Sequence, residues 1–257
     1  MTARLLSELR GPQIAELLTD RSVIVQPLGS IEQHGPHLPF STDYDVADAA
    51  AKAAMQEYGE DLDLWMLPTL AMTKSNEHAW SAGTMWLSAE TLLKVLSDIA
   101  RCVAMTPAKR LVFLNGHGGN TAMLNVACRE ARLEHGLMTF LTHPGGPPRD
   151  HGGAAPANDE LGMGVHGGIM ETSVMLHLRP DLVDMSVAVR NVPEHMAKNK
   201  YVKFGGAVAF GWLSNDFGPL GHIGDPTGAT AELGKERFEA SVHMLGEAFA
   251  EIREFRF

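Results

Sequence analysis

Cysteine, positive charge and long apolar runs are all scarce in this sequence. Only Cys102 and Cys128 carry thiols among 257 residues, and 21 Lys and Arg stand against 31 Asp and Glu, for a formal net charge of −10. Two cysteines in helix-like segments favour a reduced cytosolic chain, although one disulfide stays open. The acidic balance argues against a nucleic-acid-binding stripe and against attachment to anionic lipid.

The apolar runs are too short for a membrane protein. The longest, such as residues 111–114, fall far below the roughly 20 residues that span a bilayer. Residues 5–10 alternate apolar with charged side chains and lack a signal-peptide core. We therefore expect a cytoplasmic protein without a membrane partner. No repeat, low-complexity tract or Ser/Gly linker divides the chain, so residues 1–257 are expected to form a single domain.

Apolar strand-like runs alternate with helical stretches along the chain. Ser88 is a predicted helix N-cap. The alternation predicts an α/β fold, a three-layer αβα sandwich whose mostly parallel sheet is covered on both faces. Strands are expected over residues 23–27, 64–67, 111–114 and 137–141, and helices over residues 45–58, 88–105, 121–135 and 227–253. In such sheets ligands collect at the carboxyl ends of the strands.

The first polar motif, residues 29–39 followed by Asp43, comes directly after a predicted strand. Glu32 and His34 are two apart, so on an extended chain they project from the same side. The glycine and prolines that follow forbid a helix and turn the chain, which can return Asp43 to the same place. Two carboxylates and an imidazole suit Zn²⁺ or Mn²⁺. A Glu–His pair on a surface loop is the structural alternative.

The second motif, residues 115–120, follows a buried strand and opens a helix. Glycines on both sides of His117 let the backbone come close to a ligand, and Asn120 is placed as the helix N-cap. Because helix N-termini bind anions, a phosphate-cradling loop is the competing interpretation. The segment lacks the Lys-Ser/Thr ending of a P-loop and the spacing of a dinucleotide fingerprint.

The third motif, residues 166–173, ends a Gly/Pro-rich stretch over residues 143–165 that has no periodicity. A loop of that length in a compact domain is typically functional or mobile. His166 is a candidate general acid/base, because its ordinary pKa lies near neutrality. Glu171 falls in the first turn of an apolar helix, where the helix dipole favours a carboxylate. Simple capping of that helix is the structural alternative for Glu171.

Four segments together resemble the signature blocks of the creatininase (creatinine amidohydrolase) family, in the family's order and rough spacing: residues 29–43, 115–120, 166–173 and 224–230. The resemblance covers nearly the whole chain. It implies an α/β metal-dependent hydrolase with two divalent ions per subunit, Zn²⁺ or Mn²⁺, with Fe²⁺ able to accept the same ligands. It also implies a homo-oligomer, with a hexamer as one form, and a small-molecule substrate.

The resemblance also assigns roles to residues. It places one ion on Glu32, Asp43 and His117, and the second on His34 with Asp43 as the bridge. The creatininase pattern adds a glutamate two residues after the histidine, where this chain has Gly119. We expect Glu171 to supply the missing carboxylate, with His166 as the proton-transfer residue.

The expected reaction is the cleavage of an amide C–N bond, in a cyclic amide or a formamide, by a metal-activated water. The departure at Gly119 weakens creatinine itself as the substrate. Two alternatives are a ring C–C or lactone-type hydrolase of a keto-inositol, similar to 3-dehydro-scyllo-inosose hydrolase, and a mycofactocin-type peptide-processing protein. A binding module without catalysis is the third, and the intact metal-ligand pattern argues against it.

Residues 73–80 loosely resemble a segment that lines the pocket in the creatininase family, and they are expected to line the substrate site here. Ser75, Glu77 and His78 are its candidate substrate contacts, and an exposed polar turn is the alternative. Trp212 is a further candidate substrate contact, although large aromatic residues more often serve a core or an interface.

Overall fold

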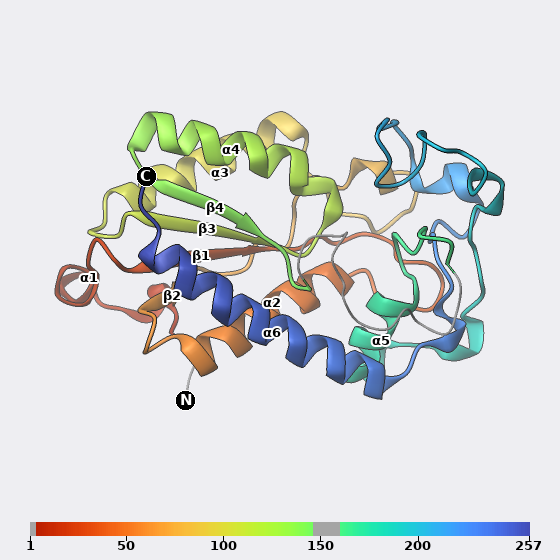
Figure 1. Cartoon of the computed structure of the whole chain (residues 1–257), viewed down its shortest axis with the longest axis horizontal. Coiled ribbons are helices and arrows are strands. Elements are labelled where there is room, and N and C mark those ends of the chain that lie inside the picture. Colours follow the sequence, from red (N-terminus) through yellow and green to blue (C-terminus); the bar gives the residue numbers. More distant parts are fainter. Residues whose placement is uncertain (1–3, 146–159) are drawn as a thin grey trace.

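The computed structural model describes residues 4–145 and 160–257 (Figure 1). Four strands form one parallel sheet in the order β2-β1-β3-β4. Their bounds are Val23–Leu28 for β1, Leu64–Met66 for β2, Arg110–Asn115 for β3 and Met138–Thr142 for β4. In register, Leu28 pairs with Asn115, so β1 and β3 end together at one edge of the sheet.

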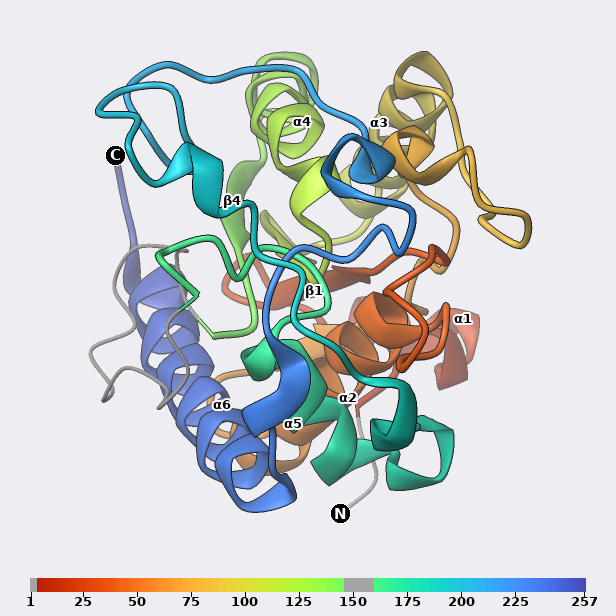
Figure 2. The ribbon, with the colours of Figure 1, turned by 90° about the vertical axis from the view of Figure 1, so that its right-hand side faces the viewer.

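Helices cover both faces of this sheet, as predicted. Helices α3 (Ala89–Ala104) and α4 (Thr121–His135) lie on one face, and α2 (Thr42–Tyr58) and α6 (Ala231–Glu254) lie on the other (Figures 1 and 2). Alternate strand residues feed the two cores. Ile24 and Phe113 pack towards α3 and α4, whereas Val25 and Leu114 pack towards α2 and α6. The period-2 alternation of a strand produces both hydrophobic layers from one apolar run.

The remaining elements lie at the two ends of the sandwich. Helix α1 spans Gly11–Leu17, and α5 spans Ile169–Leu178 and packs against α6. Short 3-10 helices occupy Leu6–Glu8, Asn76–His78, Gly118–Asn120, Pro180–Leu182, Met185–Val187, Glu194–Met196, Ser214–Phe217 and Pro226–Gly228. No helix among the described residues is long and apolar enough to cross a membrane. Both cysteines are free, Cys102 on α3 and Cys128 on α4.

Of the three predictions about helix starts, only the one for α6 is wrong. The Ser88 side chain accepts from Thr91 N as predicted. Helix α6 begins at Ala231, not at 227, because Asp225 draws Thr227 into a separate 3-10 turn and Thr230 caps the helix instead. Asn120 occupies the predicted N-cap position of α4, but its side chain makes no cap bond there. Its amide is buried between loops, where it bonds Lys74 N, Thr73 Oγ1 and Asn115 Oδ1. Most of the predicted 143–165 loop, over residues 146–159, lies outside the described residues.

Candidate metal centre

The candidate site lies where β1 and β3 end and α2 begins. Glu32 and His34 follow β1, His117 follows β3, and Asp43 is in the first turn of α2. Close backbone packing brings these segments together. A Cβ on Gly29 would lie 2.4 Å from Tyr44 Cα, so only glycine lets α2 start directly against the end of β1. The motif spacing seen in the sequence therefore becomes one cluster at the carboxyl edge of the sheet.

Asp43 is at the centre of this cluster and is 4% exposed. Its Oδ1 lies 3.1 Å from His34 Nε2, and its Oδ2 lies 2.9 Å from His117 Nδ1. Ser30 Oγ, which sequence reasoning missed, donates to Oδ2 at 2.8 Å. Each of the two carboxylate oxygens thus faces a different imidazole, which is the arrangement required of a bridging ligand.

The second nitrogen of each imidazole is held by a backbone carbonyl. His34 Nδ1 is 3.1 Å from the Glu32 carbonyl, and His117 Nε2 is 2.9 Å from the Lys74 carbonyl. A carbonyl can only accept, so in the neutral rings these nitrogens carry the proton. The lone pairs of His34 Nε2 and His117 Nδ1 then point at Asp43. Metal-binding histidines are usually oriented in this way.

The electrostatics of the protein without ions follow from this packing. Burial raises the pKa of Asp43, but His34 and His117 outweigh it and hold that pKa well below its usual range. Burial likewise lowers the histidine pKa values, and the neighbouring carboxylates outweigh it. Asp43 is the main cause for His34, whose pKa rises to about 10, and Glu32 is the main cause for His117, whose pKa rises to about 9.

Glu32 is 1% exposed, and its Oε2 lies 3.3 Å from His117 Nε2 but accepts no hydrogen bond within the described part of the chain. Its Oε1 lies 3.2 Å from His78 Nε2 and 3.7 Å from His166 Nδ1. Burial raises the pKa of Glu32 to about 8, although His117 opposes the shift. A buried carboxylate oxygen without a donor is costly unless a cation or another partner satisfies it.

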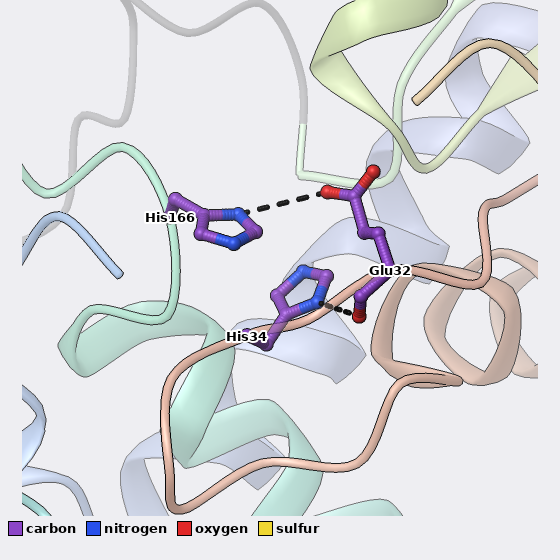
Figure 3. A group of neighbouring side chains, drawn as sticks. All are labelled: Glu32, His34 and His166. Atoms are coloured by element: carbon purple, nitrogen blue, oxygen red, sulfur yellow. Dashed lines mark hydrogen bonds and ion pairs between the residues drawn. The ribbon is translucent and has the colours of Figure 1, made fainter. Parts of the chain in front are cut away.

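Three groups of these side chains could each hold an ion. Within each group, the potential ligand atoms lie within 4.8 Å of one another. The first is Glu32, Asp43 and His117, and the second is His34, Asp43 and Glu171. A third, drawn in Figure 3, is Glu32, His34 and His166. The first two groups share Asp43.

His166 lies against the other histidines of the site. Its ring centroid is 4.1 Å from that of His34 and 4.3 Å from that of His78. Its Nε2 donates to the Gln33 carbonyl at 2.6 Å, which leaves Nδ1 as the free acceptor on the Glu32 side (Figure 3). Burial, then the positive charges of His34 and His78, lowers the His166 pKa well below its ordinary value. The ring is therefore neutral at neutral pH.

The sequence left two interpretations open for Glu171, a metal-binding carboxylate and a cap of the helix, and the structure is compatible with both. Its Oε2 accepts from Gly167 N at 2.6 Å beside the start of α5, and its carboxylate also belongs to the group of His34 and Asp43. Burial raises the pKa of Glu171, and His34 opposes that shift. Glu171 therefore stands on the His34 side of Asp43. The carboxylate next to Gly119 is that of Glu77, since a Cβ built at Gly119 would lie 2.0 Å from Glu77 Oε1.

The candidate substrate contacts are distributed unevenly around the cluster. His78 is buried against Glu32, and Ser75 is buried with its Oγ unbonded by any described residue. Glu77 is half-buried, so the exposed polar turn is not what the structure shows. Trp212 packs edge-to-face against Phe204 and Phe217. Its segment reaches the site through the nearby Ser214, whose Oγ donates to the Glu77 carbonyl at 3.3 Å.

Glu160 is a further residue that sequence reasoning missed. Its Oε1 accepts from Ile169 N at 3.1 Å and from Asp225 N at 2.7 Å, so one carboxylate joins the His166 motif to the segment over residues 224–230. A Cβ on either Gly168 or Gly224 would lie under 3 Å from this carboxylate. The glycines around Glu160 were a signal in the sequence, but only the fold shows what they surround.

Comparison with known proteins identifies relatives along nearly the whole chain. Residues 7–249 match the Creatininase family, described as creatinine amidohydrolase. A mycofactocin precursor peptide peptidase of Mycobacterium ulcerans is 36% identical, over 92% of this chain and 88% of the relative. The creatinine amidohydrolase of Pseudomonas putida is 32% identical over 66% and 70%, and the 3-dehydro-scyllo-inosose hydrolase of Thermotoga maritima is 23% identical over 94% and 81%.

Solved structures give the same fold. A crystal structure of creatinine amidohydrolase (creatininase) has a TM-score of 0.79 at 24% identity and covers 99% of both chains. A Zn–Zn form of a mutant creatininase and a manganese form of creatininase have TM-scores of 0.73 and 0.74 at 23% identity. The Zn–Zn form covers 98% of both chains, and the manganese form covers 99% of this chain and 100% of its own.

Buried carboxylates and imidazoles at the carboxyl edge of a parallel sheet, together with relatives named as amidohydrolases and peptidases, define the class: this is a metal-dependent hydrolase. More particularly, the chain belongs to the creatininase family, because the family matches residues 7–249.

Proposed function

We propose that this hydrolase cleaves an amide C–N bond with two divalent ions held around Asp43. One ion is assigned to Glu32, Asp43 and His117, and the other to His34, Asp43 and Glu171. The observation that carries the proposal is that these two groups share Asp43, whose oxygens face different imidazoles at 3.1 and 2.9 Å. Zn²⁺, Mn²⁺ and Fe²⁺ all accept such nitrogen and oxygen ligands.

The residues fit this pair of ions on three grounds. Both imidazoles turn their free nitrogen towards Asp43, since backbone carbonyls hold the opposite nitrogens. Glu32 Oε2 accepts no hydrogen bond from the described residues, since the nearby His117 Nε2, at 3.3 Å, donates to the Lys74 carbonyl. Glu32, Asp43 and Glu171 bring three carboxylates into one buried space, which like-charge repulsion disfavours unless cations are present.

The chemistry divides between the ions and the chain. Bound ions supply a Lewis acid and a water of lowered pKa. His166 is the residue that we assign to proton transfer, because its Nε2 is bound to the Gln33 carbonyl while its Nδ1 faces Glu32 with a free lone pair. The neutral ring can take a proton at Nδ1 and deliver it to the leaving nitrogen of the amide.

The relatives and the enclosure of the site favour two substrate classes. The peptidase relative is more similar and matches over more of the chain than the creatinine amidohydrolase, which favours a peptide amide as the substrate. A cyclic amide or formamide is the second candidate. It is favoured by the burial of the site residues Glu32, His34, Asp43, His117 and His166, none of which is more than 6% exposed.

The experiment is elemental analysis of the purified protein, followed by a substrate panel. Chelator-treated protein is reloaded with Zn²⁺ or Mn²⁺ and incubated with short precursor-like peptides, creatinine, formamides and a keto-inositol, with products read by mass spectrometry. About two ions per chain and cleavage of an amide only after reloading are the expected results. A chain that binds no divalent ion at saturation, or that opens only the keto-inositol, would refute the proposal.

A further inference from the structure

Gly119 and Glu77 occupy one space beside His117. A Cβ built at Gly119 would lie 2.0 Å from Glu77 Oε1 and 2.4 Å from His117 Nε2. Gly119 is not among the glycines with positive φ, so its backbone does not demand a glycine. The Glu77 carboxylate and the His117 ring together exclude a side chain at this position. The neighbouring Gly118 differs, because a Cβ there would have nothing within 4 Å.

The Glu77 side chain points inward. It is 12% exposed, with Oε1 3.6 Å from His117 Nε2 and Oε2 2.6 Å from Lys74 Nζ. Here both oxygens already have partners on the His117 side of the cluster, and the Lys74 ammonium fixes the direction of the carboxylate.

The turn that carries Glu77 also holds the His117 ring. The Lys74 carbonyl accepts from His117 Nε2 at 2.9 Å, and Lys74 N donates to the buried Asn120 at 3.1 Å. The Lys74–Glu77 ion pair closes this turn over the same imidazole. Groups that hold a metal-binding histidine from behind orient the ring and make it a stronger ligand.

We propose that Glu77 is a positioning residue of the metal centre: its carboxylate takes the space left free at Gly119 and orients His117 towards the ion shared with Glu32 and Asp43. The inference rests on the proposed two-ion function. It also assigns the acidic group beside Gly119 to Glu77, whereas Glu171 lies with His34 on the other side of Asp43. Negative charge behind the imidazole adds to the affinity for the cation that it holds.

The test compares two pairs of variants by metal affinity. Metal-free protein is titrated with Zn²⁺ in competition with a chromophoric chelator. Glu77→Gln keeps the shape and removes the charge, and Glu90→Gln, on the exposed start of α3, is its control. Gly119→Ala places a methyl group against both the Glu77 carboxylate and the His117 ring, so it tests the shared space whereas Glu77→Gln tests the carboxylate alone. Gly118→Ala is its control because it meets empty space.

We expect Glu77→Gln and Gly119→Ala to lower the affinity for one of the two ions by about 10- to 100-fold. Both controls should keep wild-type affinity. Unchanged thermal unfolding of metal-free Glu77→Gln separates this effect from misfolding. The visible spectrum of the Co²⁺-loaded protein should change in Glu77→Gln and not in Glu90→Gln. Wild-type affinity for both ions in Glu77→Gln would overturn the inference and leave the proposed function standing, whereas a wild-type chain that binds no ion would overturn the proposed function itself.

Discussion

At the scale of single residues, the site depends on how Asp43 is held. It lies in the first turn of α2, and Ser30 Oγ fixes one of its oxygens at 2.8 Å. Two imidazoles approach from the ends of two different strands. Because each oxygen of this fixed carboxylate faces a different imidazole, the loss of Asp43 should affect both ions.

Asp43→Asn should remove both ions and all measurable turnover, because the amide keeps the shape but loses the charge that both ions require. The measurement is the metal content after dialysis, alongside the rate on the best substrate. Asp45→Asn is the matched control: Asp45 lies in the same turn and accepts from Ser41 Oγ, outside the cluster. A fully loaded Asp43→Asn protein would contradict the bridging role.

His166→Ala should retain both ions and lose turnover by a factor on the order of 10² to 10⁴, as expected for a proton-transfer residue. Metal content and single-turnover rates check the two parts separately. Full activity would contradict the assignment. Loss of an ion would instead favour the third group, in which His166 binds metal together with Glu32 and His34.

The raised histidine pKa values predict how the metal-free protein responds to pH. The pKa of His34 is about 10 and that of His117 about 9, both above the ordinary 6.5. The folded state therefore holds protons that the unfolded state releases, and this stabilisation is complete below pH 6.5 and lost as the pH rises through 9 and 10. We expect the Tm of metal-free protein to fall between pH 7 and 10. Metal-loaded protein, with neutral imidazoles on the ions, should show a smaller fall, and an equal fall in both forms would contradict this account.

At the scale of elements, apolar runs and caps predicted the strands and most helices within a few residues. The sequence could place Ser88 because a cap bond is local, three residues along the chain. It placed Asn120 at the start of α4 but could not find the side chain's partners Lys74 and Thr73, which are distant in sequence. The start of α6 was missed for a different reason, since Asp225 caps a separate 3-10 turn and Thr230, a second good cap, begins the helix.

Glu160 supports a prediction at this scale, because it joins the start of α5 to Asp225 through two backbone N–H groups. Glu160→Ala leaves both groups without this acceptor and should lower the free energy of unfolding by about 1–3 kcal/mol. Urea unfolding measures it, with the exposed Glu130→Ala as the control. Because His166 and Glu171 lie on the joined segment, turnover should fall as well. A Glu160→Ala protein as stable and as active as the wild type would contradict this role.

At the scale of the whole molecule, the parallel sheet explains why residues far apart in sequence meet. Because β1 and β3 end at one edge, the motifs that follow them become neighbours, and the sequence could predict this meeting for Glu32, His34, Asp43 and His117. The role of Glu77 could not be predicted, since its approach to Gly119 depends on the fold of the short turn over residues 74–78, for which the sequence carries no periodic signal. A single domain, a cytoplasmic location and a homo-oligomer, such as a hexamer, remain predictions, and light scattering of the purified chain would test the last.

The two-ion account is tested most directly by anomalous X-ray scattering at the zinc absorption edge from crystals of the Zn²⁺-loaded protein. The account predicts two peaks, one on each side of the Asp43 carboxylate, with His117 beside one and His34 beside the other. A single peak that does not contact Asp43, or a map without peaks at this edge of the sheet, would contradict it.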